Sequence, residues 1–383
     1  MVLASSMMAS AAGNTTTTGR TPSAAPAAAS SSWLSVGAGG QHTCGIRTDR
    51  TLWCWGWNSN GALGVGDTLD RNVPTQVGTA RTWASITGGS YSTDHACGLR
   101  TDHSLWCWGG NGSGQLGLGD TRDRPVPARV GTATWERVTA GDNHTCGIRT
   151  DHTLWCWGRN IYGQLGVKDQ FDRSVPVQVG VGASWATVTA GLWQTCAIRT
   201  GQLWCWGGNF AGQLGLGDTH RRLAPVRVDK TATWASVDAG GFFTCGTRTD
   251  RTLWCWGDNQ AGQIGVGPPT PPFHVLLPTV VRAAAAWASV DGGGFFTCGI
   301  RTNATLWCWG DNQAGQLGAG DILDRSVPTQ VGTTSDWSRI SGGHPHVCGI
   351  RVDASLWCWG SNQFGQLGLG DNTDRGVPTK VTG

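Results

Sequence analysis

Apolar and aromatic residues along the chain gather in short segments that are separated by Gly-rich turns. At the start of the repetitive part these segments cover residues 33–36, 43–47, 52–55 and 73–77. Short runs of β-branched and aromatic residues bounded by turn residues are typical of β-strands. Within the third segment the rings of Trp53 and Trp55 alternate with Cys54, so both rings share one face of their strand. We therefore expect about four short strands in this part of the chain.

The same set of segments recurs along the chain. The pentapeptide Leu-Trp-Cys-Trp-Gly begins at seven places, with spacings of 49 to 53 residues: Leu52, Leu105, Leu154, Leu203, Leu253, Leu306 and Leu356. A period of this length is typical of a solenoid or a propeller. A solenoid normally has polar caps, whereas the first and last repeats here are as complete as the middle ones. We predict an all-β chain that forms a seven-bladed β-propeller of roughly four-stranded repeats.

The amino-acid composition supports an all-β fold and excludes some classes of binding partner. Only one residue is Glu and three are Lys among 383, which leaves little material for helix surfaces. The formal net charge of +3 is too small for a nucleic-acid-binding surface, so we expect a protein or another macromolecule as partner and no nucleic acid. Apolar runs fall short of the roughly 18 residues that span a bilayer, so we expect no membrane span.

The repeat resembles that of the regulator of chromosome condensation family, which forms seven-bladed propellers. The resemblance covers residues 33 to about 381, and its most specific stretches are Trp-Gly-x-Asn-x-x-Gly-Gln-Leu-Gly at 108–117 and 359–368. Family members include a nucleotide-exchange factor for a small nuclear GTPase, an ultraviolet-B photoreceptor, and interaction modules of ubiquitin ligases. The resemblance therefore implies a fold and leaves the function open.

Photoreception is disfavoured by the residues that replace the photoreceptor's working Trp. The ultraviolet-B receptor carries this Trp in Gly-Trp-Arg-His-Thr stretches on neighbouring blades. The equivalent positions here contain no Trp: Gly40, Thr93, Asp142, Leu192, Gly241, Gly294 and His344.

Two cysteines occur in every repeat. If Asp49 centres the first hairpin, Cys44 lies directly opposite Cys54, at a separation that suits a disulfide. The fourth hairpin is one residue shorter, yet its two cysteines still oppose each other. The disulfide candidates are Cys44 and Cys54, Cys97 and Cys107, Cys146 and Cys156, Cys196 and Cys205, Cys245 and Cys255, Cys298 and Cys308, and Cys348 and Cys358.

The alternative for these cysteines is that they are small buried residues in a reducing compartment. A zinc site would require closer Cys pairs or neighbouring His, and neither recurs. The pattern Thr-Cys-Gly-Ile-Arg with Leu-Trp-Cys-Trp-Gly resembles the exported bacterial branch of the family. The resemblance implies an oxidising, extracytoplasmic or secreted location, and a cytoplasmic or nuclear location is the alternative.

We divide the chain into a disordered or targeting segment, residues 1–32, and a propeller, residues 33–383. The first segment is rich in Ala, Ser and Thr and contains Arg20 as its single charged residue. It lacks a basic start and has only a weak apolar stretch, so a transit peptide, a secretory signal and a disordered tail all stay open. The regular repeats show neither the oligomeric state nor which blade is completed by strands from both termini.

The recurring polar and aromatic motifs are interpreted as structural. The paired Trp residues are expected to pack between blades, with Trp53 lying over Gly45. The Asp-x-x-Asp-Arg stretches, such as residues 67–71, are expected to cap turns rather than bind calcium, and the His before Thr-Cys to hydrogen-bond in turns. The sequence contains no recognisable set of catalytic residues, so we expect that the protein is not an enzyme and that it binds no cofactor and no metal.

Departures from the repeat indicate where a partner binds. The second repeat has an insertion around Tyr91 and Asp94, and the fifth replaces its Asp-rich loop by the apolar residues 268–281. Repeats four to six place aromatic residues where the others have polar ones, and neighbouring repeats bring these together. The predicted partner-binding residues are Leu192, Trp193, Phe242, Phe243, Phe295 and Phe296.

We therefore expect a non-enzymatic scaffold that binds a protein or another macromolecule through one face. The alternative, which rests on the family resemblance, is a guanine-nucleotide exchange factor for a small GTPase. Such a factor would need a wedge, and residues 268–281 are the one candidate for it. Within the predicted partner-binding set, the alternative for Phe243 and Phe296 is a structural role, in which their rings fill the pocket that the recurring His occupies in other repeats. Strand alternation should leave Trp193, Phe242 and Phe295 partly exposed.

Overall fold

The computed structural model describes residues 32–89, 95–282 and 285–382, all of which belong to one unit, Ser31–Gly383. Within these residues the chain forms 27 β-strands and no helix, so the all-β prediction is confirmed. No helix in this part of the chain has the length and apolar character that a bilayer crossing needs. Of the predicted disordered or targeting segment, residues 1–32, all but Ser32 lie outside the described residues, and so do residues 90–94 of the insertion in repeat two.

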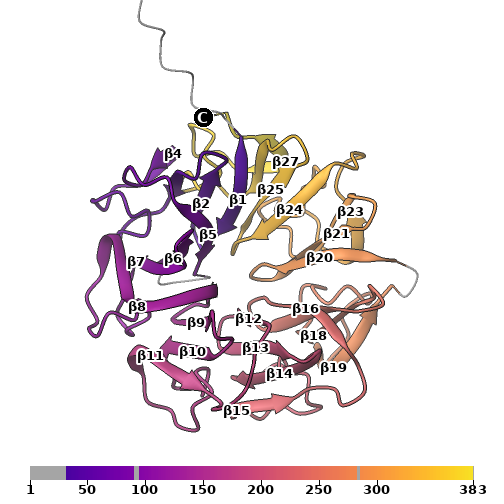
Figure 1. Cartoon of the computed structure of the whole chain (residues 1–383). Coiled ribbons are helices and arrows are strands. Elements are labelled where there is room, and N and C mark those ends of the chain that lie inside the picture. Colours follow the sequence, from indigo (N-terminus) through magenta and orange to yellow (C-terminus); the bar gives the residue numbers. More distant parts are fainter. Residues whose placement is uncertain (1–31, 90–94, 283–284, 383) are drawn as a thin grey trace, which may run out of the picture. The chain divides into compact units, whose positions relative to one another are not determined.

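The strands form seven four-stranded blades in chain order (Figure 1). Blade 1 contains β1 (Trp33–Ala38), β2 (His42–Arg47), β3 (Leu52–Gly56) and β4 (Arg71–Gln76), and blade 2 contains β5 (Trp83–Gly88), β6 (His95–Arg100), β7 (Ser104–Gly109) and the first part of β8 (Arg124–Ala140). Blade 3 contains the rest of β8, β9 (His144–Arg149), β10 (Leu154–Gly158) and β11 (Arg173–Val179), and blade 4 contains β12 (Thr187–Ala190), β13 (Gln194–Arg199), β14 (Gln202–Gly207) and β15 (Arg222–Arg227).

The last three blades follow the same plan. Blade 5 contains β16 (Trp234–Ala239), β17 (Phe243–Arg248), β18 (Leu253–Asp258) and β19 (His274–Val281). Blade 6 contains β20 (Trp287–Gly292), β21 (Phe296–Arg301), β22 (Leu306–Gly310) and β23 (Arg325–Gln330). Blade 7 contains β24 (Trp337–Gly342), β25 (His346–Arg351), β26 (Leu356–Gly360) and β27 (Arg375–Lys380). All pairings within the sheets are antiparallel.

The first strand of each blade is innermost, and the fourth lies at the rim. Strand β1 contacts β5 and β24, and β16 contacts β12 and β20, so the first strands meet around the centre. Figure 1 shows β1, β20 and β24 pointing to the centre, with β4, β15 and β19 at the periphery. Because β8 is 17 residues long and belongs to two blades, blades 2 and 3 share one seven-stranded sheet.

The ring closes by packing between the first and last blades. Each sheet is built from consecutive strands, so none of the described blades combines strands from the two ends of the chain. Instead, the Trp33 amide donates to the Ala354 carbonyl at 2.8 Å, and the Trp55 indole N–H donates to the Gln366 carbonyl at 2.9 Å. Blade 1 therefore contacts blade 7 as any blade contacts the one before it.

The predicted hairpin register is confirmed in all seven blades. Cys44 pairs with Cys54 across β2 and β3, and the shortened hairpin of blade 4 still pairs Cys196 with Cys205. Every blade carries one buried disulfide between these strands. All 14 cysteines of the chain are thereby paired.

The two Trp residues of each pentapeptide have different environments, which corrects part of our prediction. Trp55 is fully buried and packs against Gly368 of the preceding blade, as expected. Trp53 stays half-buried, and the Arg47 guanidinium stacks 3.8 Å from its ring centroid. The ring that lies over Gly45 is Trp33, because a Cβ on Gly45 would come within 2.5 Å of it. The small residue therefore accommodates the first strand's Trp.

The Asp-x-x-Asp-Arg loops cap turns, as predicted. Arg71 pairs with Asp67 at 2.6 Å, and Asp70 accepts a hydrogen bond from the Asn58 amide. The Asn58 side chain donates to the Asp67 and Leu69 carbonyls and so holds the loop together from inside. The same contacts recur in the other blades that keep the motif.

Candidate partner-binding surface

The antiparallel order of the strands gives each blade two different ends. Loops between first and second strands lie at the same end as loops between third and fourth strands. The hairpin turns between second and third strands lie at the opposite end. We call these ends the loop face and the hairpin face. All predicted partner-binding residues lie at the loop face.

The loops between first and second strands are joined to one another around the centre. The Gly241 amide donates to the Gly293 carbonyl at 3.2 Å, and the Gly294 amide donates to the Gly343 carbonyl at 3.2 Å. The His344 amide continues this series to the Gly39 carbonyl in blade 1. A Cβ on Gly241 would lie 2.5 Å from the Gly294 carbonyl oxygen, so the close approach requires glycine. These bonds hold the loops in fixed positions.

Trp193, Phe242 and Phe295 occupy equivalent places in these loops, and all three side chains are half-buried, as strand alternation predicted. Their carbonyl groups accept hydrogen bonds from a backbone amide at the end of the third strand of the same blade, for example from Asp258 to Phe242 at 3.0 Å. The backbone is therefore anchored on both sides, and the rings project from a constrained loop.

Phe243, Phe296 and Leu192 do not belong to an accessible surface, which corrects the predicted set. Phe243 and Phe296 are 0% exposed, and Leu192 is 5% exposed. The two Phe rings fill the pocket that a buried His occupies in blades 1, 2, 3 and 7. Leu192 is covered because its loop is drawn against blade 5, where its amide approaches the Gly241 carbonyl.

The recurring His connects neighbouring blades. The Nε2 atoms of His95 and His144 lie 2.9 Å from the Thr hydroxyls of the following blades, and His346 lies 2.8 Å from Thr43. Burial lowers the pKa of His95, His144 and His346 to about 3, and the neighbouring imidazoles contribute for His95. These rings are therefore neutral at physiological pH, in an interblade contact rather than a turn.

Trp193 and Phe242 form a contiguous cluster with two aromatic residues that the sequence analysis missed. Tyr162 lies 4.8 Å and Phe210 5.6 Å from the Trp193 ring centroid, and Phe242 lies 4.8 Å from it on the next blade. Tyr162 and Phe210 also contact each other at 5.1 Å. We call these four residues the aromatic patch. Phe210 is 51% exposed, and the other three are half-buried.

The missing members could have been found in the sequence. Tyr162 and Phe210 occupy the variable positions of the Asn-x-x-Gly stretch in repeats three and four, where most other repeats have Ser, Gly, Gln or Ala. They were overlooked because that stretch lies about 30 residues before or 17 after Trp193. Phe295 lies farther along the ring and contacts His344 of blade 7 at 5.8 Å.

Charge around the patch departs from the repeat in blade 4. Arg221 replaces the second Asp of the capping loop and is exposed, while Asp218 of this loop is already paired with Arg222 at 2.6 Å. Arg159 adds a half-exposed guanidinium in the loop that carries Tyr162. Asp258, beside Phe242, is buried against Gln263, and burial raises its pKa. The capping loop of blade 4 therefore has one carboxylate fewer and one guanidinium more than the loops that keep the motif.

The apolar excursion of repeat five is part of a blade. Its second half forms β19, which pairs with β18 as the outermost strand of blade 5, and residues 268–273 form the preceding loop. Leu276 of β19 packs on Gly212 of blade 4. This segment therefore takes the place of the ordinary fourth strand.

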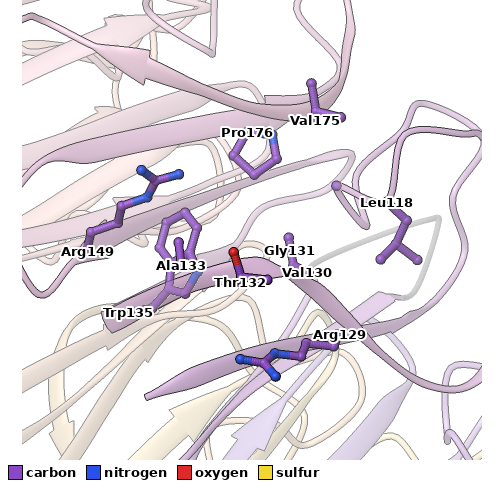
Figure 2. A pocket seen from close by; sticks show the side chains of 11 residues that line it. Leu118, Arg129, Val130, Gly131, Thr132, Ala133, Trp135, Arg149, Val175 and Pro176 are labelled. Carbon is purple, nitrogen blue, oxygen red and sulfur yellow. The ribbon is translucent and has the colours of Figure 1, made fainter. Parts of the chain in front are cut away.

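A pocket of about 490 Å³ lies between blades 2 and 3, away from the aromatic patch. Figure 2 shows Arg129, Arg149, Thr132 and Trp135 among the residues that line it. Equivalent residues line a pocket of about 350 Å³ between blades 1 and 2. Its recurrence shows that the pocket arises from the way blades pack. Among the described residues no group of His, Cys, Asp or Glu gathers to hold a metal ion.

Comparison with known proteins identifies the family. Two models of the regulator of chromosome condensation (RCC1) repeat match the chain. One matches residues 33–62, 86–115, 135–164, 234–263, 287–316 and 337–366, and the other matches residues 50–93, 102–148, 151–198, 200–246, 303–350 and 353–383. The chain belongs to the RCC1 repeat family. Each model matches six segments: those of the first lie in blades 1, 2, 3, 5, 6 and 7, and those of the second, apart from the last, run from one blade into the next and include blade 4.

Individual RCC1 relatives match over short stretches. The ultraviolet-B receptor UVR8 of Arabidopsis thaliana is 38% identical over 101 residues, which are 25% of this chain and 21% of the receptor. Protein RCC2 of Mus musculus is 36% identical over 90 residues, 23% of this chain and 17% of RCC2. The chain thus aligns with about a fifth of each relative's length.

Solved structures confirm the propeller architecture. Human WBSCR16 superposes with a TM-score of 0.77 at 21% identity, covering 87% of this chain and 94% of that one. Yeast RCC1 (Prp20), solved bound to Kap60, gives a TM-score of 0.77 at 18% identity and covers 96% and 91%. At such identities the likeness shows the fold alone.

Proposed function

We propose that this RCC1-repeat chain is a non-enzymatic propeller that captures a protein partner through the aromatic patch. The observation that carries the proposal is the contact of four aromatic rings from three neighbouring blades on one face. Large aromatic residues are enriched among the anchors of protein interfaces. Because backbone bonds hold the supporting loops, little ordering entropy is lost when a partner binds.

We infer that the partner binds through a segment of its own chain that has a large apolar side chain flanked by carboxylates. The apolar side chain would pack against the exposed ring of Phe210, and the carboxylates would face Arg221 and Arg159. Asp218 is already neutralised by Arg222, so it opposes an acidic partner weakly. Charge complementarity at the rim of an interface favours this partner over a basic one.

We also propose that the chain works outside the cytosol. Seven buried disulfides, one in each blade, are typical of proteins in oxidising compartments. Counting free thiols in the denatured protein, taken from its native source, should give nearly none. A full set of 14 free thiols would contradict the proposal.

Nucleotide exchange does not enter the proposal. The one segment considered as a wedge, residues 268–281, is the fourth strand of blade 5 and the loop before it. Prp20p of Saccharomyces cerevisiae, which binds Gsp1p and histones, shares 18% identity with this chain, and this likeness supports the fold and nothing finer.

A peptide library displayed on phage tests the proposed surface. Selection on the immobilised propeller should enrich peptides that combine Trp, Phe or Leu with neighbouring Asp or Glu. Their binding should fall at least tenfold with Phe210→Gln, because Gln stands at this position in blades 5, 6 and 7 and suits the loop. Phe364→Gln is the matched control, because Phe364 occupies the place of Tyr162 in blade 7. Equal loss with both variants, or enrichment of basic peptides, would overturn the proposal.

A further inference from the structure

The hairpin turns between second and third strands share one chemical design. In five of the seven blades an Asp opens the turn: Asp49, Asp102, Asp151, Asp250 and Asp353. In blade 1 the Asp49 Oδ1 accepts bonds from the Thr51 amide at 3.1 Å and the Thr51 hydroxyl at 2.6 Å. That hydroxyl in turn accepts a bond from the Trp53 indole. The design needs a side-chain oxygen at the first position and a hydroxyl two residues later.

Blade 6 keeps this design with a different residue. Asn303 replaces the Asp, and its Oδ1 accepts bonds from the Thr305 amide at 3.3 Å and hydroxyl at 2.7 Å. The Trp307 indole again donates to Thr305. Because Asp makes the same bonds elsewhere, the turn itself does not require the amide nitrogen that Asn303 introduces.

The substitution creates the triplet Asn-Ala-Thr at residues 303–305, which is an acceptor sequence for N-linked glycans. Asn303 is exposed at the tip of the hairpin between β21 and β22. Its oxygen holds the turn, and its Nδ2 makes no hydrogen bond to any described residue. A bulky, hydrophilic glycan requires such a surface position.

The chain offers internal comparisons, because it contains three further triplets of this type. Asn111 is 0% exposed, and its Nδ2 donates to the Asp120 and Arg122 carbonyls. Asn143 is 6% exposed, and its Nδ2 donates to Asp142. A glycan on either would displace a buried contact. The fourth triplet begins at Asn14, which lies outside the described residues.

We propose that Asn303 is an N-glycosylation site. Its Nδ2 forms a bond to the anomeric carbon of an oligosaccharide, and the bond between that carbon and a lipid pyrophosphate breaks. The amide gives up one proton, and the lipid pyrophosphate leaves. The donor is a lipid-pyrophosphate-linked oligosaccharide of the secretory pathway, so the inference rests on the proposed export of the chain.

The position of the glycan fits the proposed partner surface. Asn303 lies at the hairpin face, and the aromatic patch lies at the loop face, because the two kinds of connection occupy opposite ends of an antiparallel blade. A glycan there covers part of the hairpin face and leaves the aromatic patch open. Partners would then approach from the loop face.

The test is site-resolved mass spectrometry on the full chain secreted from cultured human cells behind a cleavable signal peptide. Enzymatic release of N-glycans in heavy-oxygen water converts each modified Asn to a labelled Asp. In the folded, disulfide-bonded fraction we expect label at Asn303 and none at Asn111 or Asn143. An unlabelled Asn303, or label at the two buried sites, would overturn the proposal.

Two variants in an Asn14→Gln background separate the acceptor from the turn. Asn303→Asp restores the residue of the five other turns and removes the acceptor amide, so the glycan-dependent mobility shift should disappear while thermal stability is kept. Thr305→Ser matches Ser104 and Ser355 and preserves the acceptor triplet, so the shift should remain. A chain secreted with free thiols would contradict the proposed export, whereas an oxidised chain without the glycan would contradict this inference alone.

Discussion

The second strands of the blades begin at a buried position that is filled in three chemically different ways: His in blades 1, 2, 3 and 7, Gln in blade 4, and Phe in blades 5 and 6. Blades 2, 3 and 7 use a His whose Nε2 contacts a Thr hydroxyl of the following blade. Blade 6 uses Phe296, which packs in one cluster with Val347 of blade 7, where most blades have Thr. Phe243 faces blade 6, which keeps Thr297 at this position. The Thr297 hydroxyl donates to the Gln263 carbonyl, so it does not need a polar partner in blade 5. At these boundaries each of the Thr hydroxyls named is therefore within hydrogen-bonding distance of a partner.

One residue earlier the constraint disappears. The residue there is Gln, Asn, Trp, Phe or Pro in different blades, and the side chains that the structure describes are half-buried, except that of Asn143, which is buried. The fold needs the backbone carbonyl of this residue, which accepts the same hydrogen bond in blades 1, 3, 4, 5, 6 and 7. Its side chain varies from blade to blade, and in blades 4 and 5 it joins the aromatic patch.

Removing a ring from the buried position should give the largest effect. Phe296→Ala should lower the free energy of unfolding by about 3–5 kcal/mol, because it leaves a cavity between blades 6 and 7. Phe295→Ala, one residue earlier, should cost about 1 kcal/mol or less. Denaturant unfolding with the disulfides intact measures both. Similar losses would show that the two positions do not differ as described.

Acid should weaken the His blades in particular. His144 has a pKa of about 3 in the fold and 6.5 when unfolded, so below pH 6.5 the unfolded state binds more protons. Stability from this ring is fully present above pH 6.5 and is lost as the pH falls toward 3. At pH 5 this His should lower the free energy of unfolding by about 2 kcal/mol relative to its value above pH 6.5.

His144→Gln, which copies Gln194 of blade 4, should remove that part of the pH dependence. The variant is compared with the parent because burial raises the pKa of Asp238 and Asp291, whose effect on stability has the opposite sign. Unfolding free energies at pH 5 and 7.5 provide the measurement. Parallel pH profiles for parent and variant would show that His144 is not buried and neutral.

Converting blade 6 to the His design tests whether the two buried residues act as a pair. Phe296→His alone places a buried imidazole against Val347, and an unsatisfied polar group costs about 1–3 kcal/mol. Adding Val347→Thr supplies the hydroxyl that His95 and His144 use. A double-mutant cycle should give a favourable coupling of about 1 kcal/mol. Strict additivity would contradict a pairwise balance across the boundary.

The smallest effect is expected at the surface. Phe210→Gln should change the unfolding free energy by about 0.5 kcal/mol or less, because the ring is 51% exposed and other blades accept Gln there. Thermal unfolding measures this change alongside the peptide-binding assay. A loss of several kcal/mol would assign Phe210 to the core and remove it from the patch.

The sequence alone was sufficient for the hairpins and for the number of blades. Opposed residues in an antiparallel hairpin follow from the position of one turn, so placing Asp49 at the turn correctly paired Cys44 with Cys54. The pentapeptide occurs seven times, and this number correctly predicted seven blades. Departures from the repeat also pointed to Trp193 and Phe242, because the remaining repeats show what the fold requires at those positions.

Contacts between blades were beyond this reasoning, because they join residues that lie about 30 to 50 positions apart, and some more than 300. The sequence pattern did not show that Phe243 and Phe296 are fully buried. Within blade 1, the pattern also did not show that Trp33 rather than Trp53 covers Gly45. It also did not show that Tyr162 and Phe210 complete the patch. Repetition and strand alternation are local properties, and they determined the strands, the register and the ring of seven. Which side chains remain at the surface was decided by packing across the blade boundaries, where the tertiary structure brings distant residues within van der Waals contact.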